Sequence, residues 1–216
     1  MTYEKPSTSI EDQIALLRNR GLAIANPATA RFYLSHIGYY RLRGYWVPFE
    51  DPATDGATHR FQSGTSFERV LNLYTFDREL RLLVNDAIER AEIFVHSQWV
   101  DVLAREGDAH TYLESSLFSS HRQYGKGLAE IAHEFEQSKE PYIRHYKKPD
   151  LPPLWAAAGI MTLGQFSHWL SNLRHTAVKT KIAKVYDLDE AVLSSFLHHL
   201  TMIRNLYAHH ARLWNR

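Results

Sequence analysis

The sequence predicts an all-α protein: a helical bundle with an N-terminal helical hairpin. Apolar residues recur at three- and four-residue steps through most of the chain, which is the period of a helix with one buried face. Residues that cap helices, such as serine, asparagine and aspartate, precede these stretches, and glycine or proline interrupts them. No region of the chain is rich in strand-like patterns.

Composition limits the classes of protein and site. The 216 residues, 44% of them hydrophobic, suffice for a domain with a buried core. No cysteine is present, which excludes disulfides, thiolate zinc sites and cysteine nucleophiles. The 25 Lys+Arg and 24 Asp+Glu nearly balance, which argues against a protein that coats nucleic acid non-specifically. The balance does not exclude a local basic site. No signal peptide and no membrane-spanning run is visible, so we expect a soluble, cytoplasmic protein that makes no contact with a membrane.

Residues 1–46 predict the helical hairpin. In TSIEDQIALLRNRG, Ser9 has the position of an N-cap and Gly21 that of a stop. In NPATARFYLSHIG, Asn26 is the cap, a proline takes the first helical position and Gly38 ends the helix.

Residues 47–65 predict a loop, with at most a short hairpin, because they are rich in Pro, Gly, Asp and Thr. Residues 66–216 predict the bundle, which we expect to form one compact unit with the hairpin. Its first helical stretch runs uninterrupted to Gly107 and would extend roughly 60 Å, unless a kink divides it into two helices. Further helices are predicted at 120–138, 155–173, 176–186 and 190–212, the last of them capped by Asp189.

Histidine is unusually frequent, with 13 copies, and occurs as adjacent pairs at 198–199 and 209–210. On one helix, His198 and His209 would lie roughly 16 Å apart along the axis. Metal ligands lie about 2 Å from their ion, so these two side chains cannot share one. We therefore expect neither a metal nor another cofactor.

The segment RNLYAH predicts a different kind of site. Asn205 and His209 are four residues apart and share a helix face, and the long side chain of Arg204 reaches the same region. A guanidinium binds phosphate oxygens, an imidazole transfers protons and an amide orients either group. The trio fits a phosphodiester substrate. The alternative is a polar helix end, where the helix dipole favours cationic side chains.

A second candidate is IGYYRLRGYW, in which Arg41 and Arg43 are interleaved with tyrosine and tryptophan. Arginine beside aromatic rings suits single-stranded RNA, because bases stack and phosphates pair. Alternatively, the rings pack the hairpin onto the bundle and the two arginines pair with acidic residues.

Charged residues recur along the long helix, among them Asp77 and Arg81 in a favourable i, i+4 order. We expect most of them to form a solvated face. A carboxylate of this helix within reach of Arg204 stays an open alternative.

The chain resembles the Abi-like abortive-infection family of bacterial phage-defence proteins, within the HEPN superfamily. The resemblance lies in ordered stretches that include YLSHIGYYRLRGYW, FERVLNLYTFDRELRLLVNDAIERAE, LPPLWAAAGIMTLGQFSHWLSNLR and IRNLYAHHARLWNR. It implies a HEPN-like bundle and, as in many HEPN proteins, a metal-independent endoribonuclease with an R-x(4–6)-H motif at a dimer interface. Arg204 and His209 match the fixed positions of that motif, and Asn205 its common second position.

The resemblance also implies a reaction. The RNA 2′-OH would attack the phosphate, leaving a 2′,3′-cyclic phosphate and a 5′-OH. His209 would transfer a proton, Arg204 would stabilise the transition state and Asn205 would orient them, with the second protomer of a homodimer completing a composite site. The implied partners are RNA and an antitoxin or non-coding RNA. RNA contacts are expected from His210, Arg212, Arg216, Arg41 and Arg43.

Two positions depart from the family pattern: Gly159, where relatives often have glutamate, and His96, near which they often have arginine. Relatives usually continue past RLWNR, which predicts a fragment or a short form. Two alternatives to the nuclease are a non-catalytic RNA-binding module of the same fold, which holds a structured RNA, and a structural homodimer in which the C-terminal segment only packs.

Overall fold

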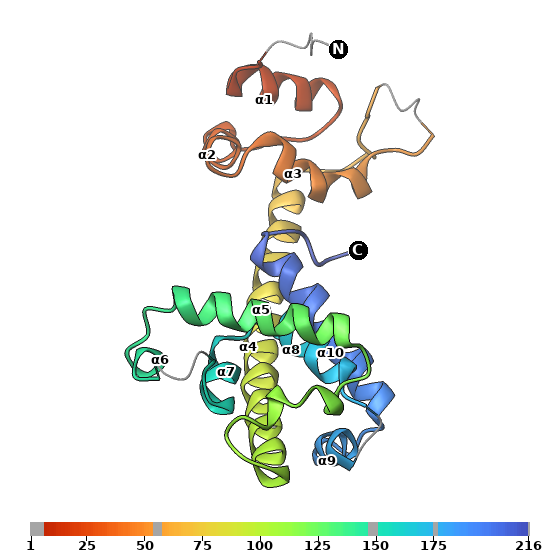
Figure 1. Cartoon of the computed structure of the whole chain (residues 1–216). Helices are drawn as coiled ribbons and strands as arrows, with labels where there is room; N and C mark the ends of the chain where they lie inside the picture. Colours follow the sequence, from red (N-terminus) through yellow and green to blue (C-terminus); the bar gives the residue numbers. More distant parts are fainter. Residues whose placement is uncertain (1–6, 54–57, 147–150, 175–176, 216) are drawn as a thin grey trace. The chain divides into compact units, whose positions relative to one another are not determined.

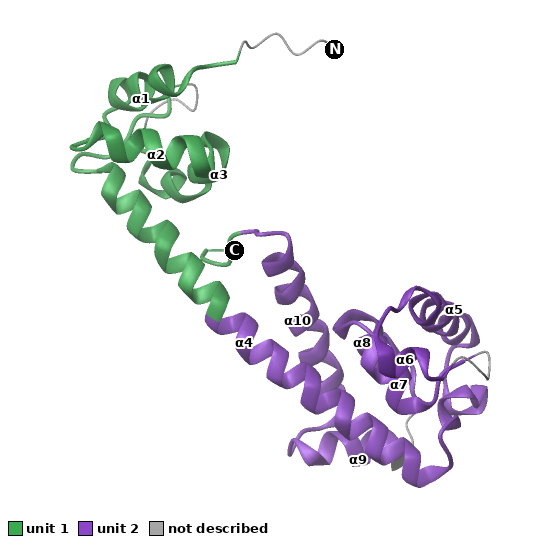
Figure 2. Cartoon of the chain, turned by 90° about the vertical axis from the view of Figure 1, so that its left-hand side faces the viewer, with its two compact units in different colours: residues 1–82, 212–216 green, residues 83–211 purple. Residues whose placement is uncertain are grey.

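In the computed structural model the chain is helical, and the all-α prediction is confirmed. Outside the helices, the described residues pair only in isolated β-bridges. The chain divides into two compact units (Figure 2): unit 1 is residues 1–82 and 212–216, and unit 2 is residues 83–211. The long helix α4, Phe67–Glu106, contributes its first part to unit 1 and the rest to unit 2. The structure describes residues 7–53, 58–146, 151–174 and 177–215.

Unit 1 begins with the predicted hairpin, in which α1 (Ile10–Asn19) packs against α2 (Pro27–Ile37). Ser9 caps α1 in a capping box with Asp12, since each side chain accepts a hydrogen bond from the other residue's backbone N–H. Asn26 caps α2 by accepting the first free N–H groups of the helix. Both predicted caps are therefore confirmed.

A third helix, α3 (Tyr39–Trp46), was missed by the sequence analysis. It follows directly after Gly38, which ends α2 with a φ of 90°, a conformation that glycine adopts without steric cost. A short 3₁₀ helix, Val47–Phe49, comes next. Glu50 and Phe61 then meet in an antiparallel bridge, which is the short hairpin allowed for in the predicted loop.

The core of unit 1 is formed by aliphatic and aromatic side chains from all of these helices. Trp46 and Phe67 are fully buried in it, and the rings of Tyr39 and Trp46 meet edge to face with centroids 4.9 Å apart. The other fully buried members are Leu17, Ala30, Leu42 and Val70. Of the aromatic residues in IGYYRLRGYW, Tyr45 and Trp46 are buried, Tyr39 is half-buried and Tyr40 is exposed, so most of these rings pack within unit 1.

Asp77 lies at the centre of a buried polar cluster in unit 1. The Tyr45 hydroxyl and the Arg81 Nε donate hydrogen bonds to one carboxylate oxygen, at 2.8 and 3.1 Å. The backbone N–H groups of Leu213 and Trp214 donate to the other oxygen, at 2.9 and 2.7 Å. Asp77 is fully buried and Arg81 is 6% exposed, so the prediction of a solvated face is wrong for this pair.

Unit 2 is a bundle in which α8 packs against both α5 and α10 (Figure 1). Its core includes the buried aromatic residues Trp99, Tyr112, Phe118, Phe166 and Trp169. Besides the second part of α4, its helices are α5 (His121–Gln137), α6 (Pro141–Arg144), α7 (Leu154–Ile160), α8 (Leu163–Asn172), α9 (Ala177–Val185) and α10 (Glu190–Ala208).

One predicted helix of unit 2 is divided. The stretch expected at 155–173 forms both α7 and α8, because Met161 is extended, with ψ of 138°. Thr162 then starts α8 with a capping box to Gln165. The pattern of threonine followed three residues later by glutamine is a start signal that the sequence analysis overlooked.

Candidate functional site

Helix α10 carries the predicted motif. Asp189 caps its start as predicted, by accepting the N–H of Ala191 at 2.8 Å. Arg204 and Asn205 lie in its last turns, and His209 is the C-cap, whose N–H donates to the Asn205 carbonyl at 3.0 Å. At about 100° per residue, Asn205 and His209 lie about 40° apart around the axis. Both are exposed, whereas Arg204 is half-buried.

The helix ends at Ala208, four residues before the predicted end. The N–H of His210 donates to the Tyr207 carbonyl at 2.8 Å, and the N–H of Ala211 donates to the Leu206 carbonyl at 2.7 Å. This is the Schellman pattern, whose left-handed position is normally occupied by glycine. Here His210 occupies it, with φ of 53°. A side chain in this conformation is strained, so the backbone that follows His209 is held against a local preference.

Glu92 of α4 is electrostatically coupled to Arg204. Burial raises the pKa of Glu92, and the nearby Arg204 guanidinium and a hydrogen bond from the Leu163 N–H oppose that rise. The carboxylate also lies at the start of α8, where helix N–H groups favour negative charge. The long helix thus supplies a carboxylate that acts electrostatically on Arg204. The sequence alone left open whether it would do so.

A cleft of about 710 Å³ lies between α4 and α7, and Glu92 is one of its lining residues. We call it the α4–α7 cleft; His96 and Val100 also line it from α4, and Trp155 and Gly159 from α7. The two departures from the family pattern, His96 and Gly159, are thus brought together in one place. At Gly159, a Cβ atom would lie 2.8 Å from the Tyr142 hydroxyl, so a larger residue would displace that side chain.

His96 is neutral at neutral pH. Burial lowers its pKa to about 4. Its ring packs against Phe166, with centroids 4.5 Å apart. Its Nε2 atom is buried and has no hydrogen-bond partner among the described residues.

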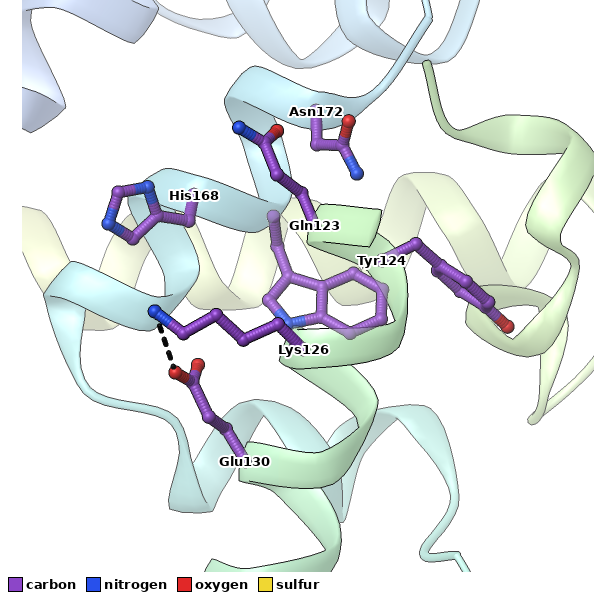
Figure 3. A pocket seen from close by; sticks show the side chains of 8 residues that line it. Gln123, Tyr124, Lys126, Glu130, His168 and Asn172 are labelled. Carbon is purple, nitrogen blue, oxygen red and sulfur yellow. Dashed lines mark ion pairs between the residues drawn. The ribbon is translucent and has the colours of Figure 1, made fainter. Parts of the chain in front are cut away.

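A second, smaller pocket lies between α5 and α8 (Figure 3). Its volume is about 120 Å³, below the roughly 300 Å³ at which small-molecule sites begin. Lys126 Nζ and Glu130 Oε1 are paired beside it at 3.5 Å. A Cβ atom at Gly127 would lie 2.7 Å from Trp169 Nε1, so this glycine allows α5 to approach the tryptophan. The pocket is therefore a packing feature.

Arg212, one of the predicted RNA contacts, has partners within unit 1. Its Nη1 donates to the Gly44 carbonyl, and its guanidinium lies over the Trp214 ring at 5.9 Å from the centroid. These contacts hold the C-terminal segment in place.

Of the remaining predicted RNA contacts, Arg41 and Arg43 lie on α3 in unit 1. Arg41 is exposed. Arg43 is half-buried, with its Nη2 3.5 Å from Nε2 of His59. Arg216 lies outside the described residues.

No three histidine, aspartate or glutamate side chains of the described residues gather as a metal site would require. Within the same residues, none of the helices has both the length and the apolar character to cross a membrane.

The sequence matches the family described as Abi-like protein over residues 32–215. The chain belongs to the Abi-like family. The match covers α3, the whole of α10 and the His209–His210 helix end. No curated protein and no solved structure matches the chain.

In this Abi-like protein, two features of unit 2 could not be predicted from the sequence. The coupling of Glu92 to Arg204 joins residues more than a hundred positions apart, and no local pattern indicates which of several acids is involved. Trp155 is 47% exposed and lines the α4–α7 cleft, and no local pattern in the sequence indicates this exposure.

Proposed function

We propose that this protein is a metal-independent endoribonuclease of the HEPN type that acts in phage defence. Membership of the Abi-like family supports the defence role. The observation that carries the chemistry is the end of α10, where a half-buried arginine adjoins two exposed polar side chains, Asn205 and His209. Such a set offers a cation, an amide and a proton carrier to one phosphodiester.

The proposed reaction uses the nucleophile that RNA carries itself. The ribose 2′-oxygen forms a bond to phosphorus, its proton passes to a base, and the P–O5′ bond breaks as the leaving oxygen receives a proton. His209 carries out one of these proton transfers. Arg204 stabilises the negative charge on the phosphorane-like transition state, and Asn205 orients the imidazole or the phosphate. The products are a 2′,3′-cyclic phosphate and a 5′-OH.

A homodimer would supply the second proton carrier as His209 of the other protomer. Apolar side chains on the exposed surface of α10 support this arrangement: Val192, Phe196 and Met202 are 51%, 50% and 55% exposed. Met202 is seven residues before His209, which places the two about 20° apart around the helix. A second copy that covers Met202 would therefore approach the motif.

The test is cleavage of a fluorescently labelled single-stranded RNA in EDTA. We expect cleavage by the wild type, products with 2′,3′-cyclic phosphate ends, and no cleavage of the same strand with 2′-deoxy sugars. Arg204→Ala and His209→Ala should each lower the rate at least about 100-fold. His199→Ala is the matched control, since this exposed histidine of the same helix hydrogen-bonds only locally, to the Ser195 carbonyl at 2.7 Å. Cleavage that needs Mg²⁺ and survives His209→Ala would contradict the mechanism.

The second candidate is a non-catalytic module that holds a structured RNA. The coupling of Arg204 to Glu92 favours it, because a carboxylate competes with phosphate for the guanidinium. Glu92→Gln separates the two functions: it should strengthen RNA binding in both cases, but yield EDTA-resistant cleavage only for the nuclease. Tight RNA binding without cleavage by either protein would support the module.

A further inference from the structure

The α4–α7 cleft has the size and lining of a ligand site. Its volume of about 710 Å³ falls within the roughly 300–1,000 Å³ of small-molecule sites. Its walls are largely apolar, with Ile93 and Val100 from α4 and Ala158 and Met161 from α7 and the turn that follows. Of the residues in the proposed chemistry, none lines it, but the charge of Arg204 acts on Glu92, which does.

Trp155 gives the cleft a flat aromatic wall. The side chain is 47% exposed, although an indole is highly buried on average. Its Nε1 donates a hydrogen bond to the Tyr146 hydroxyl at 3.1 Å, which fixes the orientation of the ring. An exposed ring held in this way is a surface on which a nucleobase can stack.

His96 lines the cleft and has a ring nitrogen without a hydrogen-bond partner among the described residues. Its Nε2 is buried and makes no hydrogen bond to the described residues, while the ring rests on Phe166. Leaving a buried polar atom unpaired costs free energy, which a hydrogen bond from a ligand would remove. Because the imidazole is neutral, it fits an uncharged base edge rather than an anion.

The charges around the cleft favour a base over a phosphate. Among the described residues that line it there is no lysine or arginine, whereas Glu92 and Asp101 are present. Asp101 is paired with Arg105 at 2.8 Å. Arg204, which the proposed function assigns to the phosphate, acts electrostatically on Glu92, a lining residue of the cleft.

We propose that the α4–α7 cleft is a nucleobase subsite, which holds the base of the nucleotide next to the scissile phosphate. Trp155 is its stacking surface and His96 its hydrogen-bond partner. This proposal rests on the proposed ribonuclease function and adds a source of sequence preference to it.

The test is calorimetric binding of the four ribonucleoside monophosphates in EDTA, with ribose 5-phosphate as the probe without a base. At least one nucleotide should bind more tightly than ribose 5-phosphate. Trp155→Ala should weaken that binding at least about fivefold, from the lost stacking. Phe76→Ala is the matched control, because it removes a similarly exposed ring from a part of α4 outside the cleft. His96→Leu should reduce the difference between bases, and His96→Gln should restore part of it.

Nucleotide binding no tighter than that of ribose 5-phosphate, or unchanged by Trp155→Ala, overturns the subsite. These measurements need no catalysis. If the subsite binds but no RNA is cleaved, the ribonuclease proposal fails and the base site stands. If RNA is cleaved with the same base preference by wild type and Trp155→Ala, the subsite fails and the ribonuclease stands.

Discussion

Asp77 in unit 1 and Arg204 in unit 2 are both charged and both at least partly buried, yet their surroundings differ. Both oxygens of Asp77 are used, each by two hydrogen-bond donors, and the side chain is fully buried. Arg204 is half-buried and interacts with Glu92, while its neighbours in the motif, Asn205 and His209, are exposed. A saturated polar cluster stabilises a fold but has nothing left to bind a ligand. In the motif, by contrast, the side chains of Asn205 and His209 are exposed and can meet a ligand.

The largest effect on stability is expected for Asp77→Ala. It leaves the buried Arg81 guanidinium without its counter-charge and three further donors without an acceptor, so unfolding free energy should fall by about 3–5 kcal/mol. The matched control is Asp86→Ala on the same helix, because Asp86 and Arg90 have the same spacing and the same 3.1 Å contact but are 63% and 79% exposed.

The control should change stability by less than about 0.5 kcal/mol, since exposed ion pairs contribute little. Urea unfolding followed by circular dichroism measures both variants. Equal losses of unfolding free energy in Asp77→Ala and Asp86→Ala would contradict the view that burial makes the first ion pair the more important one for stability.

A second prediction concerns acid and His96. Its pKa of about 4 in the folded protein lies below the usual 6.5, so the unfolded chain binds a proton first as pH falls. The neutral imidazole therefore contributes stability above pH 6.5 that is lost progressively as pH falls toward 4. Between pH 7.5 and 5 the loss should be about 2 kcal/mol.

Unfolding titrations of wild type and His96→Gln at both pH values isolate this contribution, because all other groups are common to the two proteins. Glu92, whose pKa is raised, changes stability in the opposite direction in both. A pH dependence that is the same in both proteins would mean that His96 titrates normally.

The smallest effect is expected at the end of the motif. His210→Gly should raise unfolding free energy by about 0.5–1 kcal/mol, because glycine adopts the left-handed conformation without steric cost. The same change at His199, inside α10, should lower stability by roughly 0.5 kcal/mol. If His210 contacts RNA, the stabilised variant should also bind RNA less tightly. A variant that is more stable and binds RNA equally well would assign His210 no role in the site.

Local signals predicted the starts of helices but not what surrounds their side chains. Ser9, Asn26 and Asp189 cap helices as expected, because capping depends on residues within one turn. The burial of Asp77 was not predictable, since its backbone donors, Leu213 and Trp214, lie more than 130 positions away.

The candidate site likewise has one part that the sequence predicts and another that it does not. The shared face of Asn205 and His209 follows from spacing on one helix. The α4–α7 cleft and the coupling of Glu92 to Arg204 depend on how α4, α7 and α10 pack, which the spacing of residues along one helix does not contain.

The most direct test of the motif's role is to measure RNA cleavage and stability together in His209→Ala. We predict that EDTA-resistant cleavage falls at least about 100-fold. Unfolding free energy should stay within about 0.5 kcal/mol of the wild type, because the side chain is exposed. Unchanged cleavage, or a loss of cleavage matched by a comparable loss of stability, would contradict the assignment of His209 to chemistry rather than to the fold.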